Sequence, residues 1–134
     1  MKTYFADTWY FIARIDRYDQ HHDRATRLAR KLVNDRLLTH DYVLGELLTY
    51  FSGEGAVARA RAVETVRSTR RSFEVIESSA LLFEYALDRY SRRPDKEYSF
   101  ADCMSMELME RRGITHVLTN DHHFRQEGFT VVNE

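Results

Sequence analysis

Short apolar runs in this chain alternate with longer segments in which apolar residues recur at helical spacing. Residues 3–6 form an apolar run that predicts a buried strand, and residues 9–15 behind it predict a helix. A polar loop over 16–23 precedes the most regular pattern, in which apolar residues between positions 25 and 33 recur three and four apart. The beginning of the chain therefore predicts a strand, a turn and two helices.

The same alternation continues to the C-terminus. It predicts strands at 37–39, 73–76, 116–119 and 130–132, and helices at 41–51, 56–72, 79–90 and 99–112, with Asp41 as the cap of the first of these helices. Alternating strands and helices need crossover connections, which give a parallel sheet covered on both faces. We therefore expect an α/β fold, with a single domain over 1–134 forming a three-layer α/β/α sandwich around a central, mainly parallel sheet of about five strands.

Composition narrows the class of protein. The 134 residues are 43% hydrophobic and 31% charged, which is typical of one globular domain. A net charge of −1 argues against a strong basic field over the whole molecule, so any contact with nucleic acid has to be local. Asp7 and Arg14 interrupt any signal peptide or membrane span near the N-terminus, and the single Cys103 allows no internal disulfide. These features predict a cytoplasmic protein without a membrane segment.

Two aspartates follow predicted strands. Asp7 ends the first strand, and Asp121 lies just past the strand at 116–119. In open parallel sheets, functional groups collect at the carboxyl ends of the strands, near the point where the strand order reverses. Each aspartate alone is typical of a helix cap or a turn, but the pair predicts an acidic edge.

Glu46 lies in the middle of a predicted helix and flanks its apolar stripe. We expect its side chain to be partly buried, which requires a cation, a metal ion or a proton to compensate its charge. Gly45 beside it is unfavourable in a helix and indicates a close approach of another backbone or a ligand. A buried glutamate–arginine pair is the structural alternative.

Asp102 is the last residue of the stretch Ser-Phe-Ala-Asp at 99–102. This is the pattern of a capping box, and capping alone would explain the aspartate. An acid in the first turn of a helix also projects over the sheet edge, so the same residue can serve a metal ion.

Hydrolysis of phosphodiester bonds gives a chemical reason for gathering such acids. Three or four carboxylates bind Mg²⁺ or Mn²⁺, and the ion lowers the pKa of a water molecule and neutralises the phosphate. Two other chemistries based on a strand-end aspartate do not fit. Haloacid-dehalogenase-type phosphatases need a second acid two residues after Asp7, and response-regulator receivers need an acidic pair and a strand-end lysine.

The complete set of motifs resembles the PIN-domain family and, within it, the VapC-type toxin ribonucleases of type II toxin–antitoxin systems. The resemblance covers essentially the whole chain and rests on Y-F-A-D-T at 4–8, T-H-D-Y-V-L-G-E-L-L at 39–48, S-F-A-D-C at 99–103 and V-L-T-N-D-H-H-F at 117–124. It implies a metal-dependent endoribonuclease in which Asp7, Glu46, Asp102 and Asp121 bind Mg²⁺ or Mn²⁺ and orient the attacking water.

The same resemblance implies roles for further residues. Thr8, together with Thr119 or Asn120, matches positions where small polar residues help to hold the site. The loop at 16–25, which includes His22, is expected to be structural. His122 and His123 follow the fourth acid directly, but we interpret two adjacent loop histidines as exposed residues outside the site. The bulky stretch at 9–11 departs from the family pattern and is expected to reshape the substrate groove or the partner surface.

The resemblance also implies partners. They are an RNA substrate, a small antitoxin protein and a second copy of the chain. The arginine-rich helix at 56–72 is interpreted as a solvated face, with RNA or an acidic antitoxin segment as alternatives. Tyr42, Tyr50 and Phe51 are interpreted as core or dimer-interface residues rather than base-stacking ones. A housekeeping PIN nuclease without an antitoxin and a noncatalytic PIN-like binding module are the competing functions.

Overall fold

A five-stranded sheet runs through the middle of the computed structural model, which describes all 134 residues. The strands are β1 (Thr3–Ala6), β2 (Arg36–His40), β3 (Glu74–Ile76), β4 (His116–Leu118) and β5 (Thr130–Val132). All four pairings are parallel, and the spatial order is β3-β2-β1-β4-β5. The predicted parallel sheet of about five strands is confirmed.

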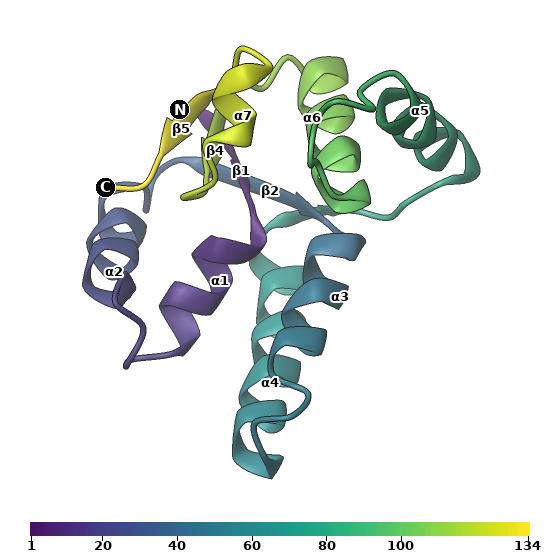
Figure 1. The fold of residues 1–134 in the computed structure, drawn as a ribbon. Helices are drawn as coiled ribbons and strands as arrows, with labels where there is room; N and C mark the ends of the chain where they lie inside the picture. Colours follow the sequence, from purple (N-terminus) through teal and green to yellow (C-terminus); the bar gives the residue numbers. More distant parts are fainter.

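Helices cover both faces of this sheet. They are α1 (Thr8–Ile15), α2 (His22–Lys31), α3 (Asp41–Tyr50), α4 (Ala56–Ser72), α5 (Ala80–Ser91), α6 (Phe100–Arg112) and α7 (His123–Gln126). In Figure 1, helices α1 to α4 lie below the sheet and α5 to α7 lie above it. The three-layer sandwich is therefore confirmed. None of the seven helices combines the length and the apolar character that a bilayer span requires.

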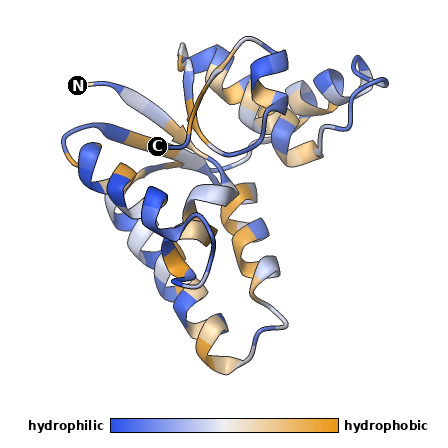
Figure 2. Cartoon of the chain, turned by 60° about the vertical axis from the view of Figure 1, so that its left-hand side comes forward, coloured by the Kyte–Doolittle hydropathy of each residue, from blue (hydrophilic) through white to orange (hydrophobic).

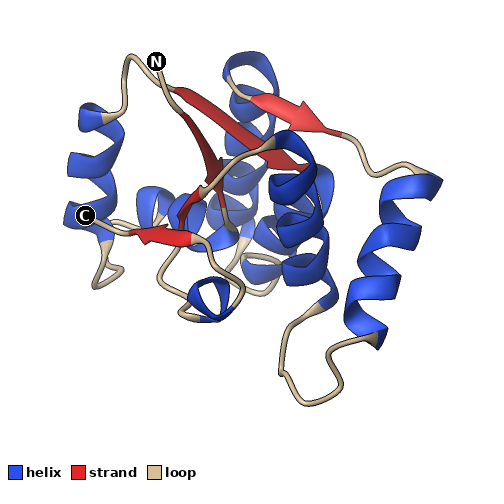
Figure 3. Cartoon of the chain, turned by 90° about the horizontal axis from the view of Figure 1, so that it is seen from above, coloured by secondary structure: helices blue, strands red, loops and turns tan.

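The strand order reverses beside β1. The chain moves from β1 to β2 and β3 on one side, and then crosses to β4 and β5 on the other side. Seen from above, α5 lies at one side of the molecule, apart from the strands (Figure 3). The switch point therefore lies where β1 and β4 end, and there the Asp7 N–H donates to the carbonyl of Leu118 at 3.2 Å.

Helix α6 forms the centre of the upper layer. Met104, Met106 and Met109 are completely buried, as are the strand residues Phe5 and Val117. Because α6 packs against the sheet on one side and α5 on the other, apolar residues surround it instead of forming one stripe. Figure 2 shows the resulting contrast between hydrophobic stretches inside the sandwich and hydrophilic loops. This packing fixes the first turn of α6 over the sheet edge.

Two predicted details at helix ends are wrong. Helix α2 ends at Lys31, because the chain turns after Leu32 towards β2 and leaves Val33 76% exposed. The cap of α3 is His40, not Asp41: its Nδ1 accepts from the Val43 N–H at 3.3 Å. Burial lowers the pKa of His40 to about 4, which keeps the imidazole neutral and able to accept. Asp41 instead accepts from the backbone N–H and the hydroxyl of Ser78, each at 3.1 Å.

Candidate active site

Asp7 and Asp121 lie beside each other at the carboxyl edge of the sheet. Asp7 directly follows β1, and Asp121 follows β4 by three residues. The fully buried Thr119 joins them, because its hydroxyl donates to Asp7 Oδ2 at 2.8 Å and accepts from the Asp121 N–H at 3.1 Å. A single hydroxyl between the two central strands therefore sets the positions of both acids.

Glu46 reaches the same edge from α3. The hydroxyl of Thr8, which is the first residue of α1, donates to Glu46 Oε1 at 2.8 Å. The expectation that Glu46 is partly buried is wrong, because α3 turns Val43 and Leu47 into the core and leaves Glu46 on its exposed flank. The predicted close approach of another backbone at Gly45 is also wrong, since a Cβ placed there would meet no protein atom within 4 Å. No arginine pairs with Glu46, so the structural alternative does not apply.

Asp102 approaches from the opposite layer, in the first turn of α6. The capping box is complete: Ser99 Oγ accepts from the Asp102 N–H at 3.0 Å, and Asp102 Oδ2 accepts from the Ser99 N–H at 3.1 Å. The cap uses only Oδ2 of the half-buried carboxylate. Capping and a place at the sheet edge are therefore compatible in this residue.

The four acids influence one another electrostatically. Burial is the main cause that raises the pKa of Asp7 to about 7, and the charges of Asp102 and Glu46 raise it further against the hydrogen bond from Thr119. Burial also raises the pKa of Asp102, with contributions from the charges of Asp121 and Glu46. The structure thus brings Asp7, Glu46, Asp102 and Asp121 to one place from four separate elements.

No arginine or lysine compensates this charge. The ion pairs that arginine and lysine form all involve other acids, and none includes Asp7, Glu46, Asp102 or Asp121. A half-buried group of carboxylates without a counter-charge has the ligand chemistry of a hard divalent cation. The residues therefore fit an Mg²⁺ or Mn²⁺ ion.

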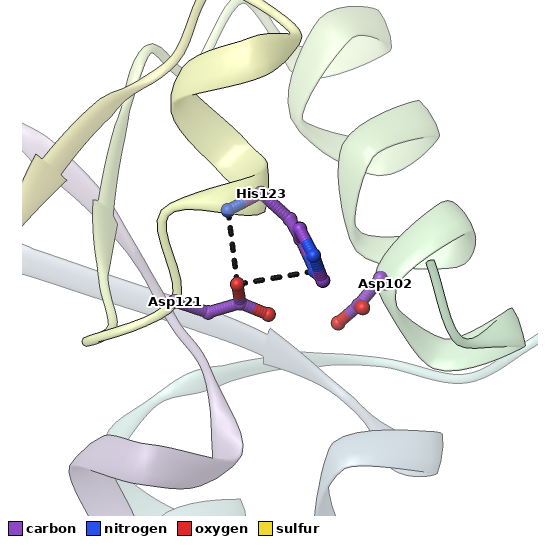
Figure 4. A group of neighbouring side chains, drawn as sticks. All are labelled: Asp102, Asp121 and His123. Atoms are coloured by element: carbon purple, nitrogen blue, oxygen red, sulfur yellow. Dashed lines mark hydrogen bonds and ion pairs between the residues drawn. The ribbon is translucent and has the colours of Figure 1, made fainter. Parts of the chain in front are cut away.

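His123 belongs to this edge, which the sequence analysis missed. One ligand atom each from Asp102, Asp121 and His123 lie within 4.8 Å of one another (Figure 4). The His123 N–H donates to Asp121 Oδ1 at 2.9 Å, and its ring Nδ1 lies 3.2 Å from the same oxygen. Both histidines were predicted to be exposed. His122 is exposed, whereas His123 is partly buried. The available signal was the spacing of two from Asp121, which is that of a turn closed by an aspartate side chain.

The other candidate residues divide into near and remote ones. Thr8 and Thr119 contact the acids directly, whereas Asn120 Oδ1 accepts from the side chain of Asn133 at the C-terminus. His22 Nδ1 donates to the carbonyl of Ala13 at 2.7 Å, which ties the start of α2 to α1. Of the two alternatives, Thr119 rather than Asn120 therefore supports the site together with Thr8.

The predicted aromatic group at 42–51 also divides. Phe51 is buried in the core, as expected, but Tyr42 and Tyr50 are 37% and 52% exposed. Tyr50 and Phe51 pack edge to face, with ring centroids 4.9 Å apart. The core interpretation therefore holds for Phe51 alone.

Comparison with known proteins agrees with this geometry. The PIN domain family matches residues 4–129. The 23S rRNA-specific endonuclease VapC20 of Mycobacterium tuberculosis is 32% identical over 132 residues, which cover 96% of each protein. Its crystal structure, described as that of a sarcin-ricin loop cleaving toxin, aligns with a TM-score of 0.83 at 30% identity over 97% of this chain and 98% of that one.

Two more distant structures share the fold. They are the DNA-bound VapBC2 of Rickettsia felis, with a TM-score of 0.73 at 15% identity, and the DNA-bound VapBC of Salmonella typhimurium, with a TM-score of 0.67 at 19% identity. Each alignment covers 98% of both chains. The family match, the full-length relative and the acidic sheet edge lead to one conclusion: the chain belongs to the PIN-domain family of nucleases and is homologous to VapC-type 23S rRNA-specific endonuclease toxins.

Proposed function

We propose that this chain is a cytoplasmic endoribonuclease that depends on Mg²⁺ or Mn²⁺ and is the toxin of a toxin–antitoxin pair. Asp7, Glu46, Asp102 and Asp121 are its metal-binding and catalytic residues, within a single PIN-like nuclease domain. The observation that carries this proposal is the convergence of four carboxylates from four elements without an arginine or lysine partner. The ribonuclease assignment is supported by the full-length VapC20 relative.

Hydrogen bonds orient each of the four acids. Thr119 holds Asp7 and the backbone of Asp121, Thr8 holds Glu46, and the capping box holds Asp102. When bound, a divalent cation supplies the positive charge that neutralises the phosphate and lowers the pKa of a water molecule. Oxygens of Asp102 and Asp121 lie within 4.8 Å of each other. Together with Asp7 and Glu46, these side chains would hold the cation and would align the water with the phosphodiester bond.

A groove between α1 and α4 is the proposed contact for an antitoxin segment. It has a volume of about 630 Å³, and its lining includes the rings of Tyr10, Phe11 and Phe73 with Arg14 and Arg61 among its polar residues. Tyr10 and Phe11 are almost fully buried, so the accessible lining is mainly polar, and its two arginines suit a peptide with acidic residues. This groove gives the arginine-rich helix α4 a role beyond that of a solvated face.

A second copy of the chain is the proposed partner of α5. This helix packs chiefly on α6 and lies at one edge of the molecule (Figure 3). Four of its apolar residues are exposed, Leu81 (60%), Phe83 (41%), Leu87 (44%) and Tyr90 (52%), and the last three share one face of the helix. An apolar face of this kind is typical of a dimer interface. Light scattering on wild type and Phe83→Glu tests this part: we expect a dimer that the substitution converts to a monomer.

Cleavage of defined RNAs tests the main proposal. Purified protein is incubated with a sarcin–ricin loop RNA and with unrelated structured RNAs in Mg²⁺, in Mn²⁺ and in EDTA, alongside Asp7→Asn and Asp88→Asn. Asp88 is an exposed acid outside the site and provides the matched control. We expect metal-dependent cutting by wild type and Asp88→Asn, and a loss of about 10³-fold or more in Asp7→Asn. Cutting in EDTA, or undiminished cutting by Asp7→Asn, contradicts the proposal.

A further inference from the structure

The imidazole of His123 is placed like a metal ligand. Its Nδ1 lies 3.2 Å from Asp121 Oδ1, and a ring nitrogen of His123 lies within 4.8 Å of an oxygen of Asp102. Two neighbouring ligands of one octahedral ion, each about 2.1 Å from it, lie about 3 Å apart. The separation between the nitrogen and the nearer oxygen is thus that of two ligands sharing one ion.

This nitrogen has no other partner. Nδ1 is shielded from solvent, and no group in the protein hydrogen-bonds to it. Its contact with Asp121 has the length of an ion pair but not the alignment of a hydrogen bond, and the Asp121 oxygen already accepts from the His123 backbone at 2.9 Å. In Figure 4 the ring lies between the two carboxylates. A buried, unpaired nitrogen beside two acids needs either a proton or a metal ion.

The position of the ring is enforced by a network behind it. Tyr98 packs edge-on against His123, with ring centroids 5.4 Å apart. The Tyr98 hydroxyl lies 3.0 Å from Glu127 Oε2 and donates to it, and Arg89 and Arg93 donate to Glu127 Oε1 at 2.8 and 3.0 Å. His122, one residue earlier, is exposed and has no such support. The network therefore holds the imidazole of His123 at the acidic edge.

We propose that His123 is a nitrogen ligand of the divalent cation, and that it shifts the preference of the site from Mg²⁺ towards transition-metal ions such as Mn²⁺ and Co²⁺. This inference rests on the proposed metal site. Carboxylates alone suit the hard Mg²⁺ ion, which retains water in preference to imidazole. An imidazole nitrogen adds affinity for transition-metal ions and more for Co²⁺ than for Mn²⁺. His123 is therefore a residue that determines which ion the nuclease selects.

Binding of metal ions to matched histidine variants tests this role. Wild type, His123→Phe, His123→Asn and His122→Phe are titrated at pH 8 with MgCl₂, MnCl₂ and CoCl₂ in a calorimeter, and the visible absorption of bound Co²⁺ is recorded. Phe preserves the ring against Tyr98 and removes both nitrogens, and Asn provides a polar variant if Phe disturbs folding. His122→Phe removes the exposed neighbour only.

We expect both His123 variants to weaken Co²⁺ binding by about 10-fold or more and Mn²⁺ binding several-fold, with Mg²⁺ changed less than 2-fold. The absorption of bound Co²⁺ changes as well, and His122→Phe behaves as wild type. Unchanged Co²⁺ and Mn²⁺ binding in the His123 variants, or an equal loss for all three ions, overturns the inference. An Asp102→Asn arm separates the two proposals: metal binding unaffected by this substitution refutes the metal site itself.

Discussion

Two groups of acids flank helix α6, and they differ in what surrounds them. Glu107, Glu110 and Glu127 gather around Arg89, whose side chain is 3% exposed and lies 3.6, 2.6 and 2.8 Å from them. At the N-terminal end of the same helix, Asp102 meets Asp7, Glu46 and Asp121 with no arginine or lysine among them. The first group is neutralised by the protein, and the second is not.

The pKa values of the acids record this difference. Burial alone would raise the pKa of Glu127, but hydrogen bonds from Arg93 and Tyr98 and the charges of Arg93 and Arg89 lower it below its usual range. Burial and neighbouring acids instead raise the pKa of Asp7 to about 7. A carboxylate that serves the fold is thus stabilised in its charged form, whereas one kept for a ligand is not.

Removing the central cation of the compensated group has the largest expected effect. Arg89→Met removes the nearest cation from the buried Glu107 and one of the two arginines bound to Glu127, and we expect it to lower the free energy of unfolding by about 3–5 kcal/mol. Urea denaturation measures this loss. Arg71→Met is the control, because the Arg71–Glu64 pair is exposed and contributes less than about 1 kcal/mol. Equal losses in the two variants would remove the distinction between the groups.

Removing a charge from the uncompensated group is expected to stabilise the protein instead. In EDTA at pH 8, we expect Asp7→Asn to raise the free energy of unfolding by about 2 kcal/mol, because it relieves a charge that the native site disfavours. Between about pH 7 and pH 4, Asp7 is protonated in the native protein but ionised in the unfolded chain. Wild-type stability from this group therefore increases as the pH falls, and the advantage of Asp7→Asn disappears near pH 4.

The informative quantity is the difference in unfolding free energy between Asp7→Asn and wild type at each pH. Burial lowers the pKa of His40 to about 4, so its contribution to stability is lost as the pH falls from about 6.5 and opposes that of Asp7. His40 is present in both proteins and cancels in the difference. A difference in unfolding free energy that stays constant from pH 8 to pH 4 would contradict the raised pKa of Asp7.

The hydroxyl that joins the two central acids has a smaller effect on stability. Thr119→Val removes the donor to Asp7 and the acceptor for the Asp121 N–H, and we expect it to cost about 1.5 kcal/mol and to reduce RNA cleavage about 10-fold. Thr119→Ser keeps the hydroxyl and should restore most of the cleavage. Single-turnover rates measure the second effect, and equal rates in the Val and Ser variants would show that the hydroxyl positions nothing.

The capping serine gives the smallest predicted effect. Ser99→Ala removes the acceptor for the Asp102 N–H and should lower the free energy of unfolding by about 1 kcal/mol. The Asp102 carboxylate still accepts from the Ser99 backbone, so we expect RNA cleavage to fall less than about 5-fold. A loss of cleavage as large as that of Asp102→Asn would mean that the cap, not the carboxylate, is what the site needs from this turn.

Periodicity was sufficient to predict the architecture. The apolar runs and helical stripes identified the five strands and the helices of this sheet, because burial on both faces demands that pattern. Strand ends also placed Asp7 and Asp121 correctly, since parallel strands end at one edge. The helix ends were predicted less accurately. In α3, a buried neutral His40 caps the helix in the role that an aspartate such as Asp41 usually has.

Details of the site that depend on packing between layers could not be read from the chain. Glu46 is exposed because of how α3 leaves the sheet, and no local pattern encodes that angle. His123 faces Asp102 because Tyr98 and Glu127 hold its ring, and these contacts join residues far apart in sequence. The sequence therefore identified the four acids, whereas the position of the His123 ring beside them depends on the fold.

Thermal unfolding of wild type and Asp7→Asn, in EDTA and in saturating Mn²⁺, tests most directly whether the acids await a cation. We expect Asp7→Asn to unfold at the higher temperature in EDTA. Mn²⁺ at about 100 times its dissociation constant should stabilise wild type by about 2.7 kcal/mol and reverse the order. Equal shifts of both proteins in Mn²⁺, with wild type already the more stable in EDTA, would contradict this expectation.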